Sequence, residues 1–298
     1  MGEAGNFTTI GFVSTSLARA SLVYERATSA LTARMALALL VNLYDVSPAY
    51  TSAVSMRMRP DVRQRLLTVS NVLNVSAVPG AKPLAWLQVL TPSVLFACAD
   101  RLLQERGSTV SHVWLIDDDL EFDRFNLAQF MRMASATNPS ILQPRVKAKV
   151  AGERSTDHYE LRYRGGSSPP VVSTCFVETQ TPFFTLNAWV LAVHPLLTQL
   201  PNASLAKSTG GISHFWCGVV QAAARNLAAH GEANVPGLAP THTCAVIDLP
   251  IVHTDARSID NKGGMIRARS PEGLMFRHEI ERILQPKPVC HQYPLGNH

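Results

Sequence analysis

Residues 111–123 read SHVWLIDDDLEFD, and this stretch sets the first expectation for the fold. The apolar run at 113–116 has the composition of a buried β-strand, and Asp117, Asp118 and Asp119 follow it directly. Carboxylates this close repel one another, so a fold keeps them together only where water or a cation relieves the repulsion. Two interpretations follow. The aspartates form either a solvated acidic turn that caps the next helix, or a metal site at the end of a buried strand.

Short apolar runs alternate with helical patterns along the rest of the chain, which is typical of an α/β sheet. Asn126 is expected to cap the helix that follows the aspartates, and Pro92 after Thr91 to restart an interrupted helix. The predicted organisation is one α/β domain over 1–285 and an irregular tail over 286–298. Strands are predicted at 9–13, 37–44, 72–78, 112–116, 141–143, 171–176, 189–193 and 245–252, and helices at 17–33, 60–67, 84–106, 126–136, 213–229 and 271–285.

The composition allows a sizeable hydrophobic core and argues against a disordered or nucleic-acid-binding protein. Of the 298 residues, 46% are hydrophobic and 16% are charged, which argues against disorder. The net charge of +5 suits a phosphate-bearing ligand, but the Lys and Arg residues are dispersed, so no nucleic-acid partner is predicted. No signal peptide pattern or transmembrane segment is seen. The five cysteines are widely spaced and odd in number, so buried free thiols are expected in place of a zinc site or a full disulfide framework.

The position of the aspartates is consistent with a metal site, and the acidic turn stays an equal alternative on this motif alone. Ligands of α/β sheets collect at the carboxyl ends of the strands, and in an extended chain Asp117 and Asp119 point to the same side and Asp118 to the other. Two such carboxylates can hold a hard divalent cation and leave positions for diphosphate oxygens, as in the DxD device of nucleotide-sugar enzymes. Phosphatases of the haloacid-dehalogenase type also use a strand followed by DxD. They require Thr or Val two positions after the second Asp, where this chain has Glu121. The sequence therefore does not favour a phosphatase of this type.

A second signal lies far downstream, where residues 244–253 read CAVIDLPIVH. This is an apolar strand that ends in His253, and a histidine at a strand end can complete a cation site that carboxylates begin. The alternative is an ordinary surface or core histidine.

Several segments together, in order, carry a resemblance to a known family. The matching segments are NF at 6–7 with IG at 10–11, LLVNLYD at 39–45, KPLAWLQVLTPSVL at 82–95, HVWLIDDDLEFDRFN at 112–126, ILQP at 141–144, VETQTPFFTLNAW at 177–189 and VIDLPIVH at 246–253. They resemble a family of plant and microbial proteins that is labelled, in plants, lysine-ketoglutarate-reductase trans-splicing related. Members of that family are expected to have the GT-A glycosyltransferase fold, a mixed and mostly parallel sheet flanked by helices.

The resemblance implies roles for individual residues. It makes Asp117 and Asp119 the DxD pair and His253 a third ligand of Mn²⁺ or Mg²⁺. Glu178 matches an acidic position on the acceptor side and becomes a candidate catalytic base or hydroxyl-binding residue. His214 stands where the family has the Asp of a Trp-Gly-Leu-Asp motif. It could serve as the base near neutral pH, or it could mean altered chemistry or none.

Four further residues are predicted on the donor side. Tyr44 and Asp45, at the end of the second predicted strand, would lie near the nucleoside, and Asp118 is counted with them as the middle residue of the DxD segment. Lys82 is a candidate for contact with the donor phosphate or ribose, its alternative being a solvated lysine at a helix start.

The predicted function is transfer of a sugar from a nucleotide-diphosphate sugar to a hydroxyl of a glycan, protein or small-molecule acceptor. The alternative is a non-catalytic protein of the same fold that binds a nucleotide or sugar, or serves as an interaction module. A third candidate function is a metal-dependent phosphate-ester hydrolase. The compartment is predicted to be the Golgi lumen if an N-terminal anchor is missing from this chain, and the cytoplasm otherwise.

Overall fold

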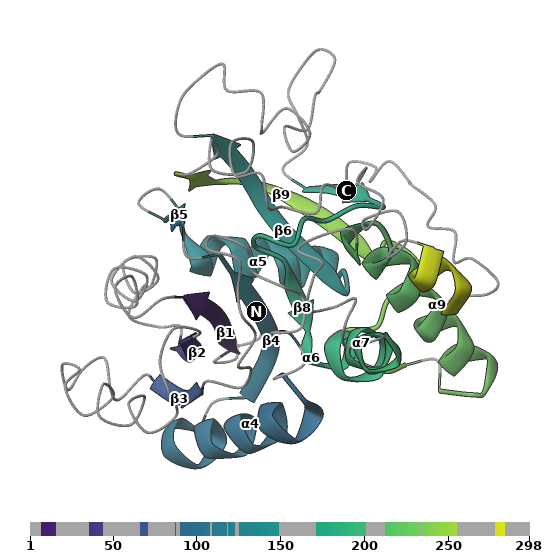
Figure 1. Cartoon of the computed structure of the whole chain (residues 1–298), viewed down its shortest axis with the longest axis horizontal. Coiled ribbons are helices and arrows are strands. Elements are labelled where there is room, and N and C mark those ends of the chain that lie inside the picture. The colour runs from purple at the N-terminus through teal and green to yellow at the C-terminus, as the bar shows by residue number, and fades with distance from the viewer. Residues whose placement is uncertain are drawn as a thin grey trace.

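The computed structural model describes residues 7–15, 36–43, 66–70, 87, 90–107, 109–117, 119–122, 125–148, 171–200, 212–232, 234–254 and 278–283. Within these residues the chain forms a nine-stranded sheet with helices packed against it (Figure 1). The strands are β1 (Phe7–Thr15), β2 (Ala36–Leu43), β3 (Leu66–Ser70), β4 (Thr109–Ile116), β5 (Leu120–Glu121), β6 (Ile141–Ala148), β7 (Val171–Thr174), β8 (Phe183–Thr185) and β9 (Cys244–His253).

The sheet is mixed and mostly parallel. Its order is β3-β2-β1-β4-β8-β6-β9-β5, and β7 also pairs with β9. The pairs β3–β2, β2–β1, β1–β4 and β6–β9 are parallel, whereas β8 lies antiparallel between β4 and β6. Because β8 is antiparallel to both neighbours, β4, β6 and β9 all end at the same edge of the sheet. This confirms the predicted architecture, a mixed and mostly parallel α/β sheet with flanking helices.

Two helices begin at the residues that the sequence pattern indicated, whereas the helix predicted from 213 begins at Trp216. Thr91 caps α4 (Pro92–Arg106), its hydroxyl accepting from the N–H of Val94, and Asn126 caps α5 (Leu127–Thr137) by accepting from the N–H of Gln129. The remaining helical segments are α6 (Leu186–Ala188), η3 (Trp189–Val193), α7 (His194–Gln199), the 3-10 turn η4 (Ile212–His214), α9 (Trp216–Ala229) and the described helical residues 278–283.

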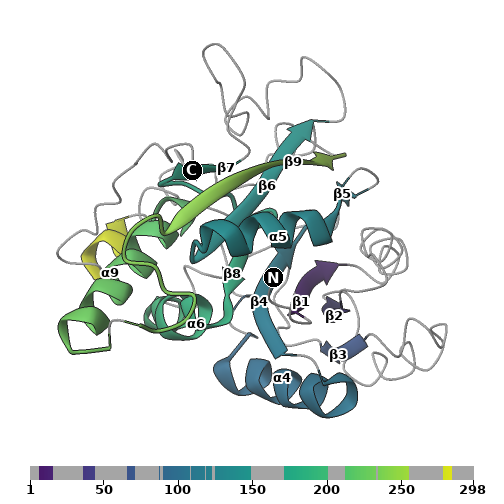
Figure 2. The ribbon, with the colours of Figure 1, turned by 180° about the vertical axis from the view of Figure 1, so that it is seen from behind.

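Alternation along β4 separates the two faces of the sheet. Trp114 lies on one face, where it stacks on Phe183 at 4.5 Å between ring centroids, and Phe130 of α5 packs on the same phenylalanine. Figure 2 shows α5 lying in front of the sheet on this side. Val113 and Leu115 lie on the other face, in the core that α4, α7, η4 and α9 cover. A residue's position in β4 therefore tells which helical layer it faces.

Three predictions of secondary structure are wrong. Residues 189–193 were predicted as a strand because Trp, Val, Leu, Ala and Val favour sheets, but they form η3. Their buried members Trp189, Ala192 and Val193 continue at helical spacing into Leu196 and Leu197. Residues 66–67, predicted as a helix end, belong to β3. The predicted strand 171–176 ends at Thr174. The short strands β5 and β8 were not predicted, since runs of two and three residues leave no periodic pattern.

Among the described cysteines, the expectation of buried thiols holds for Cys98 alone, which is buried and not disulfide-bonded. Cys217 and Cys244 form a disulfide with their Cα atoms 5.7 Å apart, and Cys175 is disulfide-bonded as well. The bridge joins the first turn of α9 to the first residue of β9, two elements that pack together in the core.

The predicted helix at 17–33, the predicted strand at 72–78 and the boundary between 285 and 286 lie outside the described residues.

Candidate active site

The first candidate metal ligand, Asp117, lies at the carboxyl end of β4. The last four residues of this strand are buried, and Asp117 follows at the edge, where it is partly exposed. The main chain of Asp117 remains fixed because its N–H donates to the carbonyl of Gln180 at 2.9 Å. The strand-end position predicted for Asp117 is therefore the observed one.

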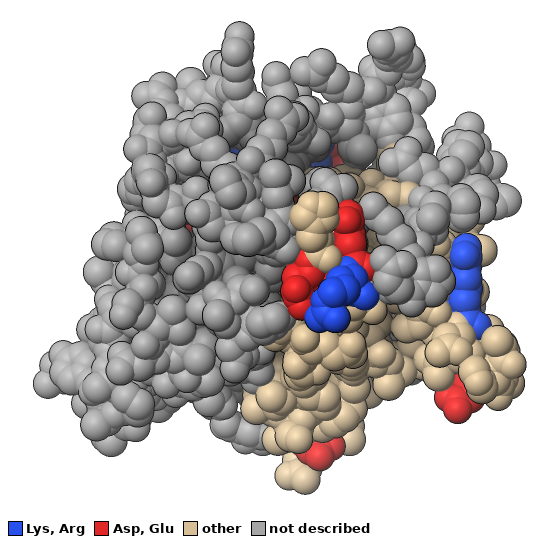
Figure 3. All heavy atoms as spheres, turned by 45° about the vertical axis from the view of Figure 1, so that its right-hand side comes forward, with Lys and Arg blue, Asp and Glu red and all other residues tan. Residues whose placement is uncertain are grey.

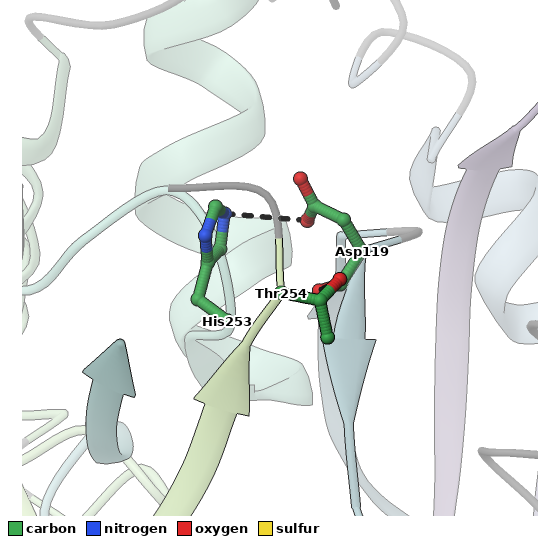
Figure 4. Close-up of polar contacts among 3 residues, drawn as sticks. All are labelled: Asp119, His253 and Thr254. Carbon is green, nitrogen blue, oxygen red and sulfur yellow. Dashed lines mark hydrogen bonds and ion pairs between the residues drawn. The ribbon is translucent and has the colours of Figure 1, made fainter. Parts of the chain in front are cut away.

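Asp119 is fixed by the end of β9, although the two segments are far apart in sequence (Figure 4). Leu120 pairs with His253 across β5 and β9. The carbonyl of Asp119 accepts two hydrogen bonds from Thr254, one from its N–H at 2.9 Å and one from its hydroxyl at 2.8 Å. These bonds lock the backbone of the acidic turn to the residue that follows His253.

The structure brings Asp117, Asp119 and His253 together. One ligand atom of each lies within 4.8 Å of the other two, and Nε2 of His253 is 3.3 Å from Oδ1 of Asp119. The imidazole is almost fully buried, with 2% of His253 exposed, and points toward the carboxylate (Figure 4).

This donor set fits a divalent cation. Two carboxylate oxygens suit a hard cation, and the added imidazole nitrogen favours Mn²⁺ over Mg²⁺, whose ligands are predominantly oxygens. An octahedral cation held by three protein ligands has further positions for other oxygens. The three residues would therefore hold Mn²⁺ or Mg²⁺ with coordination positions left for a ligand.

Glu178 lies at the same edge of the sheet. Residues 180 and 182 continue the pairing of β8 with β4, since the carbonyls of Gln180 and Pro182 accept from Asp117 and Leu115. Glu178 is two residues beyond Gln180, is 9% exposed, and donates its N–H to Oε1 of Gln143 at 2.6 Å. Gln143 is itself buried on β6, so the backbone of Glu178 is held between two strands that end beside the candidate metal centre.

The other predicted residues are placed only in part. The backbone of His214 forms the end of η4, directly before α9, and its side chain is outside the described part of the structure. Tyr44, Asp45, Lys82 and Asp118 lie outside the described residues altogether.

Sequence reasoning missed the residues that support the site, namely Gln143, Gln180 and Thr254. Thr254 had a signal in the sequence, because a hydroxyl residue directly after a strand-end ligand is well placed to bond a neighbouring backbone. The two glutamines had none, since their role depends on the antiparallel insertion of β8.

One histidine of the sheet is kept neutral. His112 on β4 accepts or donates through Nδ1 to the hydroxyl of Ser111 at 2.8 Å, and burial lowers its pKa from 6.5 to about 4. It lies five residues before Asp117 on the same strand and is distant from the candidate ligands.

Two of the described basic side chains form ion pairs with acidic ones. Arg145 pairs with Asp248 at 2.8 Å between β6 and β9, and Arg282 pairs with Glu279 at 2.7 Å. Figure 3 shows acidic and basic side chains side by side on one described face. Within the described residues, no helix is long and apolar enough to cross a membrane.

Comparisons with known proteins give only distant structural likenesses. No protein-family model matches the chain, and no curated protein matches it. TarS of S. aureus is similar at 10% identity and a TM-score of 0.45, over 84% of this chain and 36% of that chain. The TarS fragment 1–349 in complex with UDP-GlcNAc is similar at 13% identity and a TM-score of 0.35, over 62% of this chain and 46% of that chain. A mycobacterial protein is similar at 12% identity and a TM-score of 0.38, over 97% of this chain and 76% of that chain.

This chain thus spans only about a third of the length of the first of these structures, 36% of it. No functional argument rests on likenesses this distant, and the proposals below stand on the geometry of the site.

Proposed function

We propose that this protein is a metal-dependent glycosyltransferase that moves a sugar from a nucleotide-diphosphate sugar to an acceptor hydroxyl. The observation that carries the proposal is the convergence of Asp117, Asp119 and His253 within 4.8 Å at the carboxyl edge of a mostly parallel sheet. Ligands of such sheets bind at this edge, and three protein ligands, which leave further coordination positions, suit a cation shared with a diphosphate.

On the donor side, the chain supplies a preorganised set of ligands. The hydrogen bonds of Thr254 to Asp119 and the burial of His253 hold two of the ligands without help from a substrate. Bound there, Mn²⁺ or Mg²⁺ would neutralise the negative charge that develops on the departing nucleoside diphosphate. Tyr44, Asp45, Lys82 and Asp118 remain proposed contacts of the donor.

On the acceptor side, Glu178 is the proposed base. Its backbone is fixed by Gln143 at the edge that carries the metal ligands, so its carboxylate can receive a proton from an acceptor hydroxyl brought to the donor sugar. Taking that proton raises the nucleophilicity of the oxygen. His214, at the start of the α9 layer, is the second candidate for this role.

The second candidate function is a non-catalytic protein that binds a nucleotide sugar. It is favoured by the histidine at position 214, where the resemblance implies an aspartate. The two functions share the cation and the nucleotide, and only turnover separates them.

The first experiment measures binding. The melting temperature of the protein is recorded against a panel of nucleoside diphosphates and nucleotide sugars, with and without Mn²⁺. We expect at least one nucleotide to raise it only when Mn²⁺ is present, and Asp119→Asn to remove that rise. Asp248→Asn is the matched control, since Asp248 also lies on this sheet but pairs with Arg145 away from the three ligands. A panel without any Mn²⁺-dependent rise, or a rise that survives Asp119→Asn, refutes the proposal.

The second experiment measures turnover of the nucleotide sugar that binds. Release of nucleoside diphosphate in the presence of acceptor sugars separates the transferase from the binding protein. We expect Glu178→Gln to lower kcat by at least tenfold while the Mn²⁺-dependent rise in melting temperature is kept. Binding without turnover in the wild type would favour the non-catalytic function.

A further inference from the structure

Gln180 has a buried acceptor atom without a partner. The residue is 9% exposed, and within the described part of the structure its Oε1 is buried and receives no hydrogen bond. A buried amide oxygen without a donor costs about 1–3 kcal/mol of stability relative to one that is satisfied. Such a cost is uncommon in a core and requires a reason.

The register of the sheet places Gln180 directly beside a candidate metal ligand. Trp114 pairs with Phe183 across β4 and β8, and continuing this register brings Asp117 opposite Gln180. The hydrogen bond from Asp117 N–H to the carbonyl of Gln180 confirms the pairing. Directly opposite residues of antiparallel strands have their Cβ atoms about 5 Å apart and on the same face.

The segment that contains Gln180 is anchored on both sides. Thr181 accepts a hydrogen bond from Nε1 of Trp114 at 2.9 Å, so its side chain lies on the Trp114 face. Gln180 itself lies in a bend, and its carbonyl accepts from the N–H of Asp117. The unpartnered Oε1 therefore belongs to the residue whose main chain is bonded to a candidate metal ligand.

We propose that Gln180 binds a hydroxyl group of the nucleotide sugar and is a specificity-determining residue of this site. Its Oε1 can only accept a hydrogen bond, so the ligand atom must carry a proton. The proposal rests on the proposed function, since the diphosphate held at Asp117, Asp119 and His253 brings the hydroxyl groups of the sugar and of the ribose within a few bonds of this position.

An acceptor atom that is kept unpaired for a ligand hydroxyl lowers the stability of the free protein and strengthens binding of the ligand. Replacing the amide by an apolar side chain of the same length removes the unsatisfied oxygen, which stabilises the free protein, and also removes the hydrogen bond to the ligand. A residue with a merely structural hydrogen bond behaves in the opposite way, because its replacement destabilises the protein.

The experiment therefore measures two quantities on Gln180→Met. The first is the melting temperature of the protein without ligand, which we expect to rise by about 2–5 °C. The second is Kd, measured by calorimetry with Mn²⁺ for UDP, UDP-glucose and UDP-N-acetylglucosamine. The nucleotide sugar that the wild type binds is expected to bind about two- to tenfold more weakly to the variant. If the hydroxyl belongs to the sugar, Kd for UDP stays unchanged; if it belongs to the ribose, Kd for UDP rises equally.

Thr9→Val is the matched control. Thr9 is 1% exposed, its Oγ1 is also buried without a partner in the described structure, and it pairs with His112, five residues before Asp117 on β4. At about 3.3 Å per residue this is roughly 17 Å from the ligands. Thr9→Val should raise the melting temperature and leave every Kd unchanged.

A fall in the melting temperature of Gln180→Met overturns the proposal, because it shows a structural partner for the amide. A rise with unchanged Kd for the nucleotide sugar overturns it as well. A wild type that binds no nucleoside diphosphate or nucleotide sugar of the full panel with Mn²⁺, these three probes included, overturns the proposed function itself, and that measurement needs no Gln180 variant.

Discussion

The Cys217–Cys244 bridge is expected to contribute a large share of the stability of this protein. It closes a loop between residues 27 apart, from the first turn of α9 to the start of β9. In the chain-entropy model, closing such a loop in the unfolded state stabilises the folded state by about 3.5 kcal/mol at 25 °C. Both cysteines are 0% exposed, so the bridge is packed in the core on all sides.

The perturbation is the double variant Cys217→Ala/Cys244→Ala. Urea unfolding followed by circular dichroism should give a free energy of unfolding lower by about 3.5 kcal/mol, and thermal unfolding a melting temperature lower by about 5 °C. Cys98→Ala is the control, because Cys98 is buried and not disulfide-bonded, so its replacement leaves the bridge intact. A reductant should lower the free energy of unfolding of the wild type and of Cys98→Ala, because it breaks the Cys217–Cys244 bridge. The double variant lacks this bridge, so a reductant should lower its free energy of unfolding by a smaller amount.

A peptide map of the unreduced protein without a link between residues 217 and 244 would refute this reasoning. Equal free energies of unfolding for the wild type and the double variant would refute it too. Since disulfides persist in oxidising compartments, we expect more folded protein from expression in an oxidising compartment than from a reducing cytosol. This favours a lumenal or extracellular location over a cytoplasmic one as the proposal to test.

Three further predictions concern single residues. The pKa of His112 falls from 6.5 to about 4 on folding, so the unfolded chain binds its proton first as the pH drops. In urea titrations between pH 6.5 and 4, the wild type should lose up to about 3 kcal/mol of its free energy of unfolding relative to His112→Gln. Above pH 7 the difference in free energy of unfolding between the two proteins should not change with pH. Gly237→Ala should destabilise by about 2–4 kcal/mol in the same assay, because Gly237 has φ +74 and an added Cβ would lie 2.7 Å from the Cβ of Thr185. Thr254→Val removes one of the two hydrogen bonds to the carbonyl of Asp119, so calorimetry should show Mn²⁺ binding weakened about tenfold with the fold intact; unchanged affinity would contradict the support we assign to it.

The candidate ligands could be predicted because their signals are local. An apolar run followed by aspartates marks a strand and its end, and the run before His253 marks another. Both strands are where the sequence places them, and the two ends meet because β4 and β9 run in the same direction. Strand direction in an α/β sheet is itself predictable, since parallel strands linked by helices must end at one edge.

The disulfide could not be predicted, because its signal is not local. Cys217 lies on a helix and Cys244 on a strand, and their spacing in the sequence matches no known motif. What decides their pairing is that α9 packs over the start of β9, bringing the Cα atoms to 5.7 Å. An odd count of cysteines excludes only a complete framework and leaves individual bridges open.

The prediction of a strand at 189–193 was wrong for a related reason. Its five residues favour a strand by composition, but Thr185 caps a helical start at the end of β8, its hydroxyl accepting from the N–H of Ala188. Once the helix has begun, burial of Trp189 against α4, with Nε1 donating to the carbonyl of Leu90 at 2.8 Å, stabilises it. Tertiary packing therefore overrides the intrinsic preference of an apolar run this short.

The site shows a division between residues that a motif reveals and residues that only the fold reveals. Asp117, Asp119 and His253 stand out because their side chains have the chemistry of ligands. The groups that hold them are backbone atoms of Asp119 and Gln180, which any residue supplies. Substitution of residues that contribute only backbone atoms should therefore be tolerated as long as β5 and β8 keep their pairing, whereas Thr254 also supports the site through its hydroxyl, so its replacement should be felt at the metal centre.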